Sequence, residues 1–433
     1  MNRLFNIEDS LANKISYYHI MLLMVSLPFD MFYSHLILIS LVVHTFIHLK
    51  KEAFKNIPTF RTVMLQSVFF ITVLSTVYSI NKPAAFTEWG KQVTIFLFPV
   101  VFCLNPLDLR KYRPQLLLVF STACTAIIAY LYIDAAVTIR HYKLPISALF
   151  SSAFTNHNFS EPIKMHATFF ALQVALGLIY MLSMLIKQRL FYNRLLYLIC
   201  SVILTAGIIQ LSSKSVFIAV FIVINTALPW LLLKGRQRLA FFLFSTVISV
   251  LLMVTIISSS TLKERYITEL KSDLSVKSPS ATIDSRLARW EIAGNLIIKA
   301  PVIGYGAGAE TGLLQEEFFK NKLYSSFLNR LNTHSQYLSF LIKSGVIGLL
   351  IYITTLVFGF NCAYREKDLL LFAFMALIAA VSFSENLLDV DKGIFYYAFF
   401  FSFFIFSQKQ PKHRSSTTDK HRLQEGHNAG IMV

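Results

Sequence analysis

The chain has 433 residues, of which 55% are hydrophobic and 15% are charged, and 40 Lys and Arg against 23 Asp and Glu give a formal net charge of +17. Soluble domains have about a quarter of their residues charged, so this composition excludes an ordinary soluble protein and predicts an integral membrane protein. The basic residues lie in short gaps between apolar runs and form no basic stripe with interleaved aromatics. We therefore exclude nucleic acid as a partner.

The predicted fold is all-α, a polytopic membrane protein with about twelve transmembrane helices. Apolar segments near the length of about 20 residues that spans a bilayer occur nine times within residues 1–258 and three times within 336–407. We interpret these ranges as an N-terminal bundle and a C-terminal group of transmembrane helices. Residues 259–335 form one long loop between them, and residues 408–433 form a polar tail that we expect to be disordered.

The basic residues predict the orientation of the helices, because cytoplasmic loops carry an excess of Lys and Arg. With the N-terminus in the cytoplasm, the cytoplasmic segments hold 22 Lys and Arg, whereas the short external loops hold seven. This alternation predicts that both termini are cytoplasmic and that the long loop 259–335 lies outside. Long loops cross the membrane largely regardless of their charge, so the basic residues of this loop do not contradict the prediction.

Two ionisable residues stand at predicted external helix ends before the long loop, where such groups are costly and often functional. His166 begins the sixth predicted span, and a capping or structural histidine is an equally good interpretation. Lys214 lies in a turn among Ser212, Ser213 and Ser215. The alternative for Lys214 is a lysine that extends to the lipid headgroups.

The long loop contains a predicted amphipathic helix from Arg286 to Lys299, with Asp284 or Ser285 as its N-cap and Pro301 after its end. A glycine-rich turn at 304–308 and a second helical piece from Glu310 to Asn329 follow.

Three side chains of the loop are candidates for chemistry. Arg286 and Arg289 are three residues apart, so they project to one side of a helix and could bind an anion, although a solvated helix face has the same pattern. His334 lies at the end of the loop, where a neutral imidazole could take a proton from a hydroxyl group. A structural role is an equally good interpretation for His334 alone.

Acidic residues follow the eleventh predicted span. Glu385 and Asp389 are four apart, which on a helix puts them on one face. Capping, or pairing with Lys392, is the favoured interpretation for Asp389. Lys343 is the exceptional charge inside a predicted span.

The external positions of these residues predict a site for a lipid substrate that bears phosphate. It combines cations with a potential base and comprises Lys214, His166, Arg286, Arg289, His334 and Glu385. No P-loop, Gly-x-Ser-x-Gly or His-Glu-x-x-His motif accompanies them, so neither nucleotide hydrolysis nor serine or zinc hydrolysis is predicted. The four cysteines have no metal-ligand spacing, and we expect no metal site.

The order of the motifs resembles the signature of the O-antigen ligase and polymerase superfamily of bacterial inner-membrane glycosyltransferases. The matching residues are Ser285, Arg286, Trp290, Pro301, Gly304, Gly306, Gly308, His334, Ser335, Tyr337, Leu338, Gly345 and Gly348. Ser335 replaces the usual Asn, and Lys214 stands where many members have Arg. Lysine still binds phosphate as a point charge, but it lacks the bidentate fork of arginine.

The resemblance implies an inverting glycosyltransferase without a cofactor, in the bacterial inner membrane. Its donor is a glycan on undecaprenyl pyrophosphate, and its acceptor is lipid A-core, a growing glycan or a protein hydroxyl. The implied roles are pyrophosphate binding for Arg289, Arg286 and Lys214, and activation of the acceptor hydroxyl by His334. His166 and Glu385 are expected to bind the acceptor or to orient His334.

Alternatives to a ligase remain open. The motifs do not separate a ligase from a polymerase, although a single long external loop favours the ligase, because the 139–164 loop has about 25 residues and one Arg. A protein O-oligosaccharyltransferase is a third hypothesis. A flippase or secondary transporter is disfavoured, because such proteins line a mid-membrane cavity with polar groups and contain internal repeats.

Overall fold

The computed structural model describes residues 6–49, 54, 57, 59–258, 260–275 and 284–408. These residues form helices joined by turns and contain no strand, which confirms the all-α prediction. The predicted tail lies outside the described residues from position 409 onward.

Each predicted apolar segment coincides with a helix or with one continuous helical stretch. Before the loop these are α2 (Leu11–Ser26), α3 (Met31–Ile47), α4 (Phe60–Val77), α5 (Lys82–Leu104), α6 (Leu109–His141), α8 (Ala167–Lys187), α9 (Phe191–Leu211), α10 (Lys214–Ile222) with η5 (Val223–Ala227) and α11 (Leu228–Leu232), and α12 (Gly235–Ser258). After it come α18 (Gln336–Glu366), α19 (Leu369–Val381) and α20 (Asp391–Phe406).

Seven of these stretches, in the described part of the chain, are long and apolar enough to cross a membrane by length and composition. They are α4, α6, α8, α9, the stretch from α10 to α11, α12 and α18. The chain is therefore a multi-pass membrane protein, whereas the number of about twelve spans stays a prediction.

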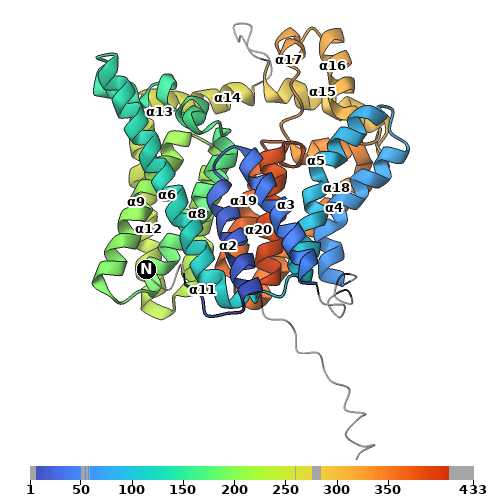
Figure 1. Cartoon of the computed structure of the whole chain (residues 1–433). Helices are drawn as coiled ribbons and strands as arrows, with labels where there is room; N and C mark the ends of the chain where they lie inside the picture. Colours follow the sequence, from blue (N-terminus) through green and yellow to red (C-terminus); the bar gives the residue numbers. More distant parts are fainter. Residues whose placement is uncertain are drawn as a thin grey trace, which may run out of the picture.

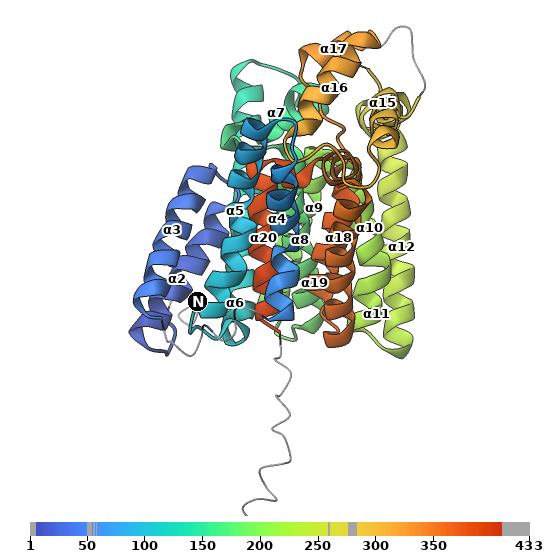
Figure 2. The same cartoon turned by 90° about the vertical axis from the view of Figure 1, so that its right-hand side faces the viewer.

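The last helix, α20, lies in the centre of the bundle (Figures 1 and 2). Every residue from Gly393 to Ile405 is buried, and α20 packs against α4, α5, α6, α18 and α19. A helix that is apolar around its whole circumference is suited to a protein core or to contact with lipid, and α20 lies in the core. In contrast, α12 lies at the edge, with most of its side chains exposed.

The long loop forms a helical layer across one end of the bundle (Figure 1). Its elements are α13 (Ser260–Lys263), η6 (Glu264–Thr268), α14 (Glu269–Asp273), α15 (Arg286–Lys299), α16 (Ala309–Lys320) and α17 (Tyr324–Leu328). Helix α15 has the predicted bounds, and the Ser285 side chain accepts from the Ala288 N–H at its start. The predicted helical piece 310–329 is wrong as one helix, because the chain turns at Lys322 with φ 60°.

This layer has a small hydrophobic core of its own. Ile292 and Leu296 of α15 pack against Leu314 and Phe318 of α16 and against Ile342 of α18. The beginning of α18 therefore belongs to the core of the loop layer as well as to the bundle.

Helix α18 is broken at Gly345, whose φ of 61° and ψ of −160° are not helical. The glycine-rich turn of the loop makes hydrogen bonds to the backbone groups on either side of this break. The N–H groups of Tyr305 and Gly306 donate to the carbonyls of Ile342 and Lys343 at 2.9 and 2.8 Å. The Val346 N–H in turn donates to the carbonyl of Pro301 at 2.9 Å. The broken helix thus leaves these buried backbone groups paired.

The same turn also docks against the connection between α4 and α5. The Ile80 N–H donates to the Tyr305 carbonyl at 3.2 Å, and the Ser79 hydroxyl donates to the Ala307 carbonyl at 2.6 Å. Gly306 has φ 93°, and a Cβ at this position would overlap the backbone of Ser79. Only glycine allows this approach.

Candidate functional site

The backbone before α18 is held by helix α15. The Arg289 Nη1 donates to the Asn332 carbonyl at 3.3 Å, and the Trp290 Nε1 donates to the Thr333 carbonyl at 2.9 Å. His334 follows in a left-handed conformation with φ 47°, and its N–H donates to Asn332 Oδ1 at 3.0 Å. The arginine and tryptophan of the motif therefore fix the position of the histidine.

His334 and Glu385 form a histidine–carboxylate pair, with 3.3 Å between Nδ1 and Oε2. Burial alone would raise the pKa of Glu385, but the hydrogen bond from His334 and the positive charge of Arg286 lower it below its usual value. The ionised carboxylate can only accept, so Nδ1 of His334 donates and Nε2 remains as the proton acceptor. This geometry suits a base that acts on a hydroxyl group.

Two cations stand beside this pair. Arg286 Nη1 donates to the Ser384 carbonyl at 3.0 Å, and its Nε lies 3.5 Å from a carboxylate oxygen of Asp273 in α14. Lys214 begins α10, and its Nζ lies 3.3 Å from Glu269 of α14. The hydroxyl groups of Ser384 and Ser215 are 2.8 Å apart, so the start of α10 adjoins the segment that carries Glu385.

Arg289 is the most deeply buried cation of the candidate site, with 4% of its surface exposed. Among the described residues no carboxylate lies within ion-pair distance of it, and its Nε has no acceptor. Burial, followed by repulsion from Arg286, lowers the pKa of Arg289 to about 10. The guanidinium therefore stays charged at neutral pH, and its hydrogen bond to the Asn332 carbonyl holds it close to His334.

His166 lies at the N-cap position of α8 without capping that helix, so the capping interpretation is wrong. Its ring lies 4.1 Å from the ring of His157 in α7 (His157–Ser160). Burial, with smaller contributions from His157, His334 and Lys392, lowers the pKa of His166 to about 4 against the opposing charge of Glu385. His166 is thus an uncharged imidazole at neutral pH and not one of the cations.

A second polar cluster surrounds Lys343, close to the His334–Glu385 pair. Its Nζ lies 2.7 Å from Glu88, 2.7 Å from Asp389 and 3.7 Å from Glu310. The interpretation that Asp389 pairs with Lys392 is wrong, because Asp389 binds Lys343. Lys392 instead donates to a backbone carbonyl, that of Lys164.

One further prediction is corrected at this cluster. Glu385 and Asp389 do not share a helix face, because α19 ends at Val381 and Asp389 ends the short 3-10 helix η7 (Leu387–Asp389). Glu385 therefore contacts His334, whereas Asp389 contacts Lys343. Lys343 lies in α18 just before the break at Gly345, and it contacts Glu310 of the loop layer.

The cluster positions the residues on both sides of the histidine. Glu310 accepts from the N–H and hydroxyl of Thr333 at 3.1 and 2.9 Å and from Asn386 Nδ2 at 3.0 Å. The Asn386 Oδ1 accepts from the Ser335 N–H at 2.8 Å. Thr333 and Ser335 flank His334, and Asn386 follows Glu385, so this network holds both partners of the pair.

Sequence reasoning did not identify Glu88, Glu310 or Asn386. The usable signal was Lys343, because a lysine inside an apolar run needs a carboxylate partner. Its partners lie up to 255 residues away in the chain, where helical periodicity contains no information about contacts.

Residues 199–353 match the family model described as O-antigen ligase, and this range includes Lys214, Arg286, Arg289 and His334. His166 and Glu385 lie outside the matched range. No curated protein matches the chain.

Proposed function

We propose that the chain moves a glycan from undecaprenyl pyrophosphate to lipid A-core or a similar acceptor, and the match of residues 199–353 to the O-antigen ligase family model supports this proposal. The family supports the coarser statement, a ligase- or polymerase-type membrane enzyme that uses a lipid-linked glycan and an acceptor. The observation that carries the proposal is the His334–Glu385 pair beside Arg286 and Arg289. The reaction takes place on the periplasmic side of the bacterial inner membrane, and both termini are cytoplasmic.

His334 acts on the acceptor in this proposal. Its Nε2 takes the proton of the acceptor hydroxyl while the oxygen attacks the anomeric carbon of the donor. The new C–O bond forms as the bond to pyrophosphate breaks from the opposite face, which inverts the anomeric centre. Glu385 keeps Nδ1 protonated and stabilises the imidazolium that forms, as carboxylates do for histidine bases elsewhere.

The cations act on the donor. Negative charge grows on the pyrophosphate as the glycosidic bond breaks, and fixed positive charge at that position lowers the barrier. Arg286 and Lys214 are paired with Asp273 and Glu269 of α14, so pyrophosphate oxygens would replace these two carboxylates. Arg289 adds positive charge without a competing carboxylate among the described residues. The neutral His166 would contribute a hydrogen bond to the acceptor rather than charge.

The first test of the proposed mechanism replaces the pair residue by residue. We expect His334→Gln to lower glycan transfer in membranes by about 10²- to 10⁴-fold, the usual contribution of a positioned base. Glu385→Gln should also lower the maximal rate, because the carboxylate that accepts from Nδ1 and orients the imidazole is lost. Controls are the exposed residues His141→Gln and Glu316→Gln. Near-normal activity of His334→Gln would contradict the mechanism.

The reaction class is tested in a deletion strain by separating envelope glycans and staining both lipopolysaccharide and the lipid-linked pool. Loss of all long chains from lipid A-core, with full-length glycan accumulating on undecaprenyl pyrophosphate, is the result expected of a ligase. Lipid A-core that carries one repeat unit would indicate a polymerase instead. An unchanged lipopolysaccharide profile would contradict both and favour a protein acceptor or transport.

A further inference from the structure

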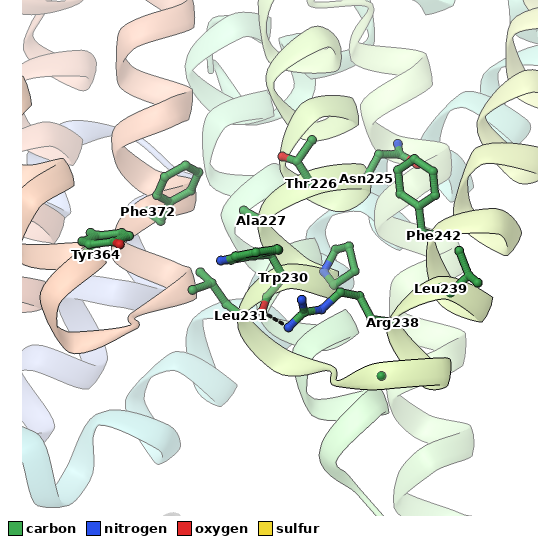
Figure 3. Close-up of a pocket in the computed structure, with 13 residues that line it drawn as sticks. Asn225, Thr226, Ala227, Trp230, Leu231, Arg238, Leu239, Phe242, Tyr364 and Phe372 are labelled. Carbon is green, nitrogen blue, oxygen red and sulfur yellow. Dashed lines mark hydrogen bonds between the residues drawn. The ribbon is translucent and has the colours of Figure 1, made fainter.

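A pocket of about 580 Å³ lies at the opposite end of the bundle from the loop layer (Figures 1 and 3). It opens between the turn from α11 to α12 and the connection from the end of α18 to the start of α19. Four of the thirteen lining residues are aromatic, namely Trp230, Phe242, Tyr364 and Phe372. Trp230, Phe242 and Tyr364 are exposed, so the pocket opens sideways where the bundle meets lipid.

One charged side chain, Arg238, lines this pocket, and its position is fixed. The guanidinium lies over the Trp230 ring at 4.4 Å, and its Nε and Nη2 donate to the Leu233 carbonyl at 3.0 and 2.9 Å. Nη2 also donates to the Trp230 carbonyl at 3.2 Å. Arg238 thereby satisfies carbonyls at the end of α11 that have no helical partner.

The Nη1 group of Arg238 is left for a ligand, since it makes no hydrogen bond to any of the residues that the structure describes. Guanidinium N–H groups bind phosphate oxygens with short, charge-assisted hydrogen bonds. The pocket therefore offers a phosphate-binding group at one end and an apolar, aromatic wall beside it.

The surroundings of the pocket carry excess positive charge. Lys234 and Arg236 lie in the same turn as Arg238, and Arg365 and Lys367 follow Tyr364 at the end of α18. The nearby acidic residues are Glu366 and Asp368, and Asp368 is already paired with Arg113 at 2.7 Å. By the distribution of Lys and Arg this end of the bundle faces the cytoplasm, where the leaflet contains anionic lipids.

The inner end of the pocket is closed by a wide turn in the helical stretch. Residues Val223–Ala227 form a π-helix, a local widening that often marks a functional position. Asn225 in this turn donates to the Ser249 hydroxyl of α12 at 3.1 Å and so joins the two walls.

We propose that this pocket binds an anionic phospholipid of the cytoplasmic leaflet. The phosphate lies on Arg238 Nη1, and one acyl chain lies between Trp230, Phe242 and Phe372. Basic pockets between transmembrane helices on the cytoplasmic side suit such headgroups. The proposal is independent of the glycan transfer reaction, because the pocket includes Tyr364 near the end of α18, whereas His334 precedes the start of that helix.

The test uses the full chain in lipid nanodiscs and measures tryptophan quenching by phospholipids brominated on the acyl chain. The chain has three tryptophans, so subtracting the signal of Trp230→Phe isolates the contribution of Trp230. We expect brominated phosphatidylglycerol to quench Trp230 at about a fivefold lower mole fraction than brominated phosphatidylcholine. Equal quenching by the two lipids would overturn the anionic site. No quenching by either lipid would also overturn it and would indicate a protein partner in the pocket.

Arg238→Gln should abolish the preference for phosphatidylglycerol. The matched control is Arg236→Gln, which removes the same charge from an exposed position of the same turn that does not line the pocket. Trp230 emission of each variant in phosphatidylcholine discs shows whether the turn between α11 and α12 is intact. If this turn is intact, Arg238→Lys, which keeps the charge, should retain part of the preference for phosphatidylglycerol. An equal loss in Arg236→Gln and Arg238→Gln would overturn the site in favour of general surface charge.

Discussion

The three cations of the candidate site differ in how their charge is balanced. Arg286 and Lys214 each have a carboxylate of α14 within 3.5 Å, whereas Arg289 has none among the described residues. Arg289 is also the one that binds the backbone next to His334. A lysine at 289 would keep the charge but lose the planar fork that holds this position. Arg289 is therefore the cation least open to conservative replacement.

The half-buried His166 predicts an acid-sensitive fold. The pKa of His166 is about 4 in the folded chain, against an ordinary value of 6.5. Above pH 6.5 the His166 imidazole is neutral in both the folded and the unfolded chain. Between pH 6.5 and pH 4 the imidazole is protonated in the unfolded chain alone, so the free energy of unfolding falls as the pH is lowered. At pH 5 this loss amounts to about 2 kcal/mol, from about 1.4 kcal/mol for each pH unit below the unfolded value.

Thermal unfolding in detergent between pH 7 and pH 5 measures this effect. The melting temperature of His166→Gln should fall less over this range than that of the unsubstituted chain. The exposed His141→Gln should show the unsubstituted slope. Identical slopes for His166→Gln and the unsubstituted chain would contradict the assignment of His166 as a half-buried neutral imidazole.

Individual residues of the site could be predicted to different degrees. His334, Arg286 and Arg289 belong to a local motif with a recognisable order, and the structure brings them together with Glu385. Glu88 and Glu310 could not be found in the same way, because each is an ordinary helical glutamate until its distant partner is known. Long-range pairing is a property of the packed bundle and not of any segment of it.

At the scale of the elements, the docking of the loop layer depends on glycine. Replacing Gly306 by Ala forces a Cβ into the Ser79 backbone at a positive φ, so we expect the glycine turn to detach from α4 and α5. Backbone strain of this kind costs about 1–3 kcal/mol, and the steric overlap of the new Cβ with Ser79 increases this cost. Glycan transfer should fall more than tenfold, and limited proteolysis should cut the loop faster at an unchanged protein level in the membrane.

Gly312→Ala is the control for this substitution, since Gly312 lies in α16 and nothing lies within 4 Å of its Cβ position. Alanine is a better helix former than glycine, so this variant should be as stable as the unsubstituted chain or slightly more so. If both variants lose activity equally, the close approach at Gly306 is not the cause.

Prediction of single elements succeeded where local signals were strong. Ser285 as N-cap and Pro301 after the end define α15, whose bounds are those predicted. The helical pattern of the sequence continues across Lys322, so it did not indicate the turn between α16 and α17. The apolar pattern likewise continues across Val381, so it did not indicate that α19 ends there. Those breaks arise from tertiary packing, which overrides a helical pattern.

At the scale of the whole molecule, the basic loops predict a definite orientation that cysteine labelling can check. In a variant without the four native cysteines, Lys320→Cys on exposed α16 should react with an impermeant maleimide added to intact spheroplasts. Arg236→Cys, in the turn between α11 and α12, should react only after the membrane is permeabilised. Labelling with the opposite preference would contradict the predicted orientation of the chain.

Composition predicts the membrane class and the helical fold, but it does not predict which helices occupy the centre. Hydropathy treats α20 as one more apolar segment, although eight of the twelve residues from Ile394 to Ile405 are aromatic and all are buried. These rings interdigitate with those of α5 and α19, such as Phe98 and Phe374. The position of the last helix in the middle follows from this packing.

The break in α18 has a consequence for how related chains can be recombined. The carbonyls of Ile342 and Lys343 are satisfied by the loop layer, so a foreign loop without a fitting glycine turn would leave them unpaired. A loop grafted alone into a membrane protein whose corresponding helix is unbroken would find the carbonyls of that helix already paired within it. The glycine turn would then have no acceptors for its N–H groups. The smallest interchangeable unit is therefore the loop together with the first turns of α18, up to and including the break at Gly345.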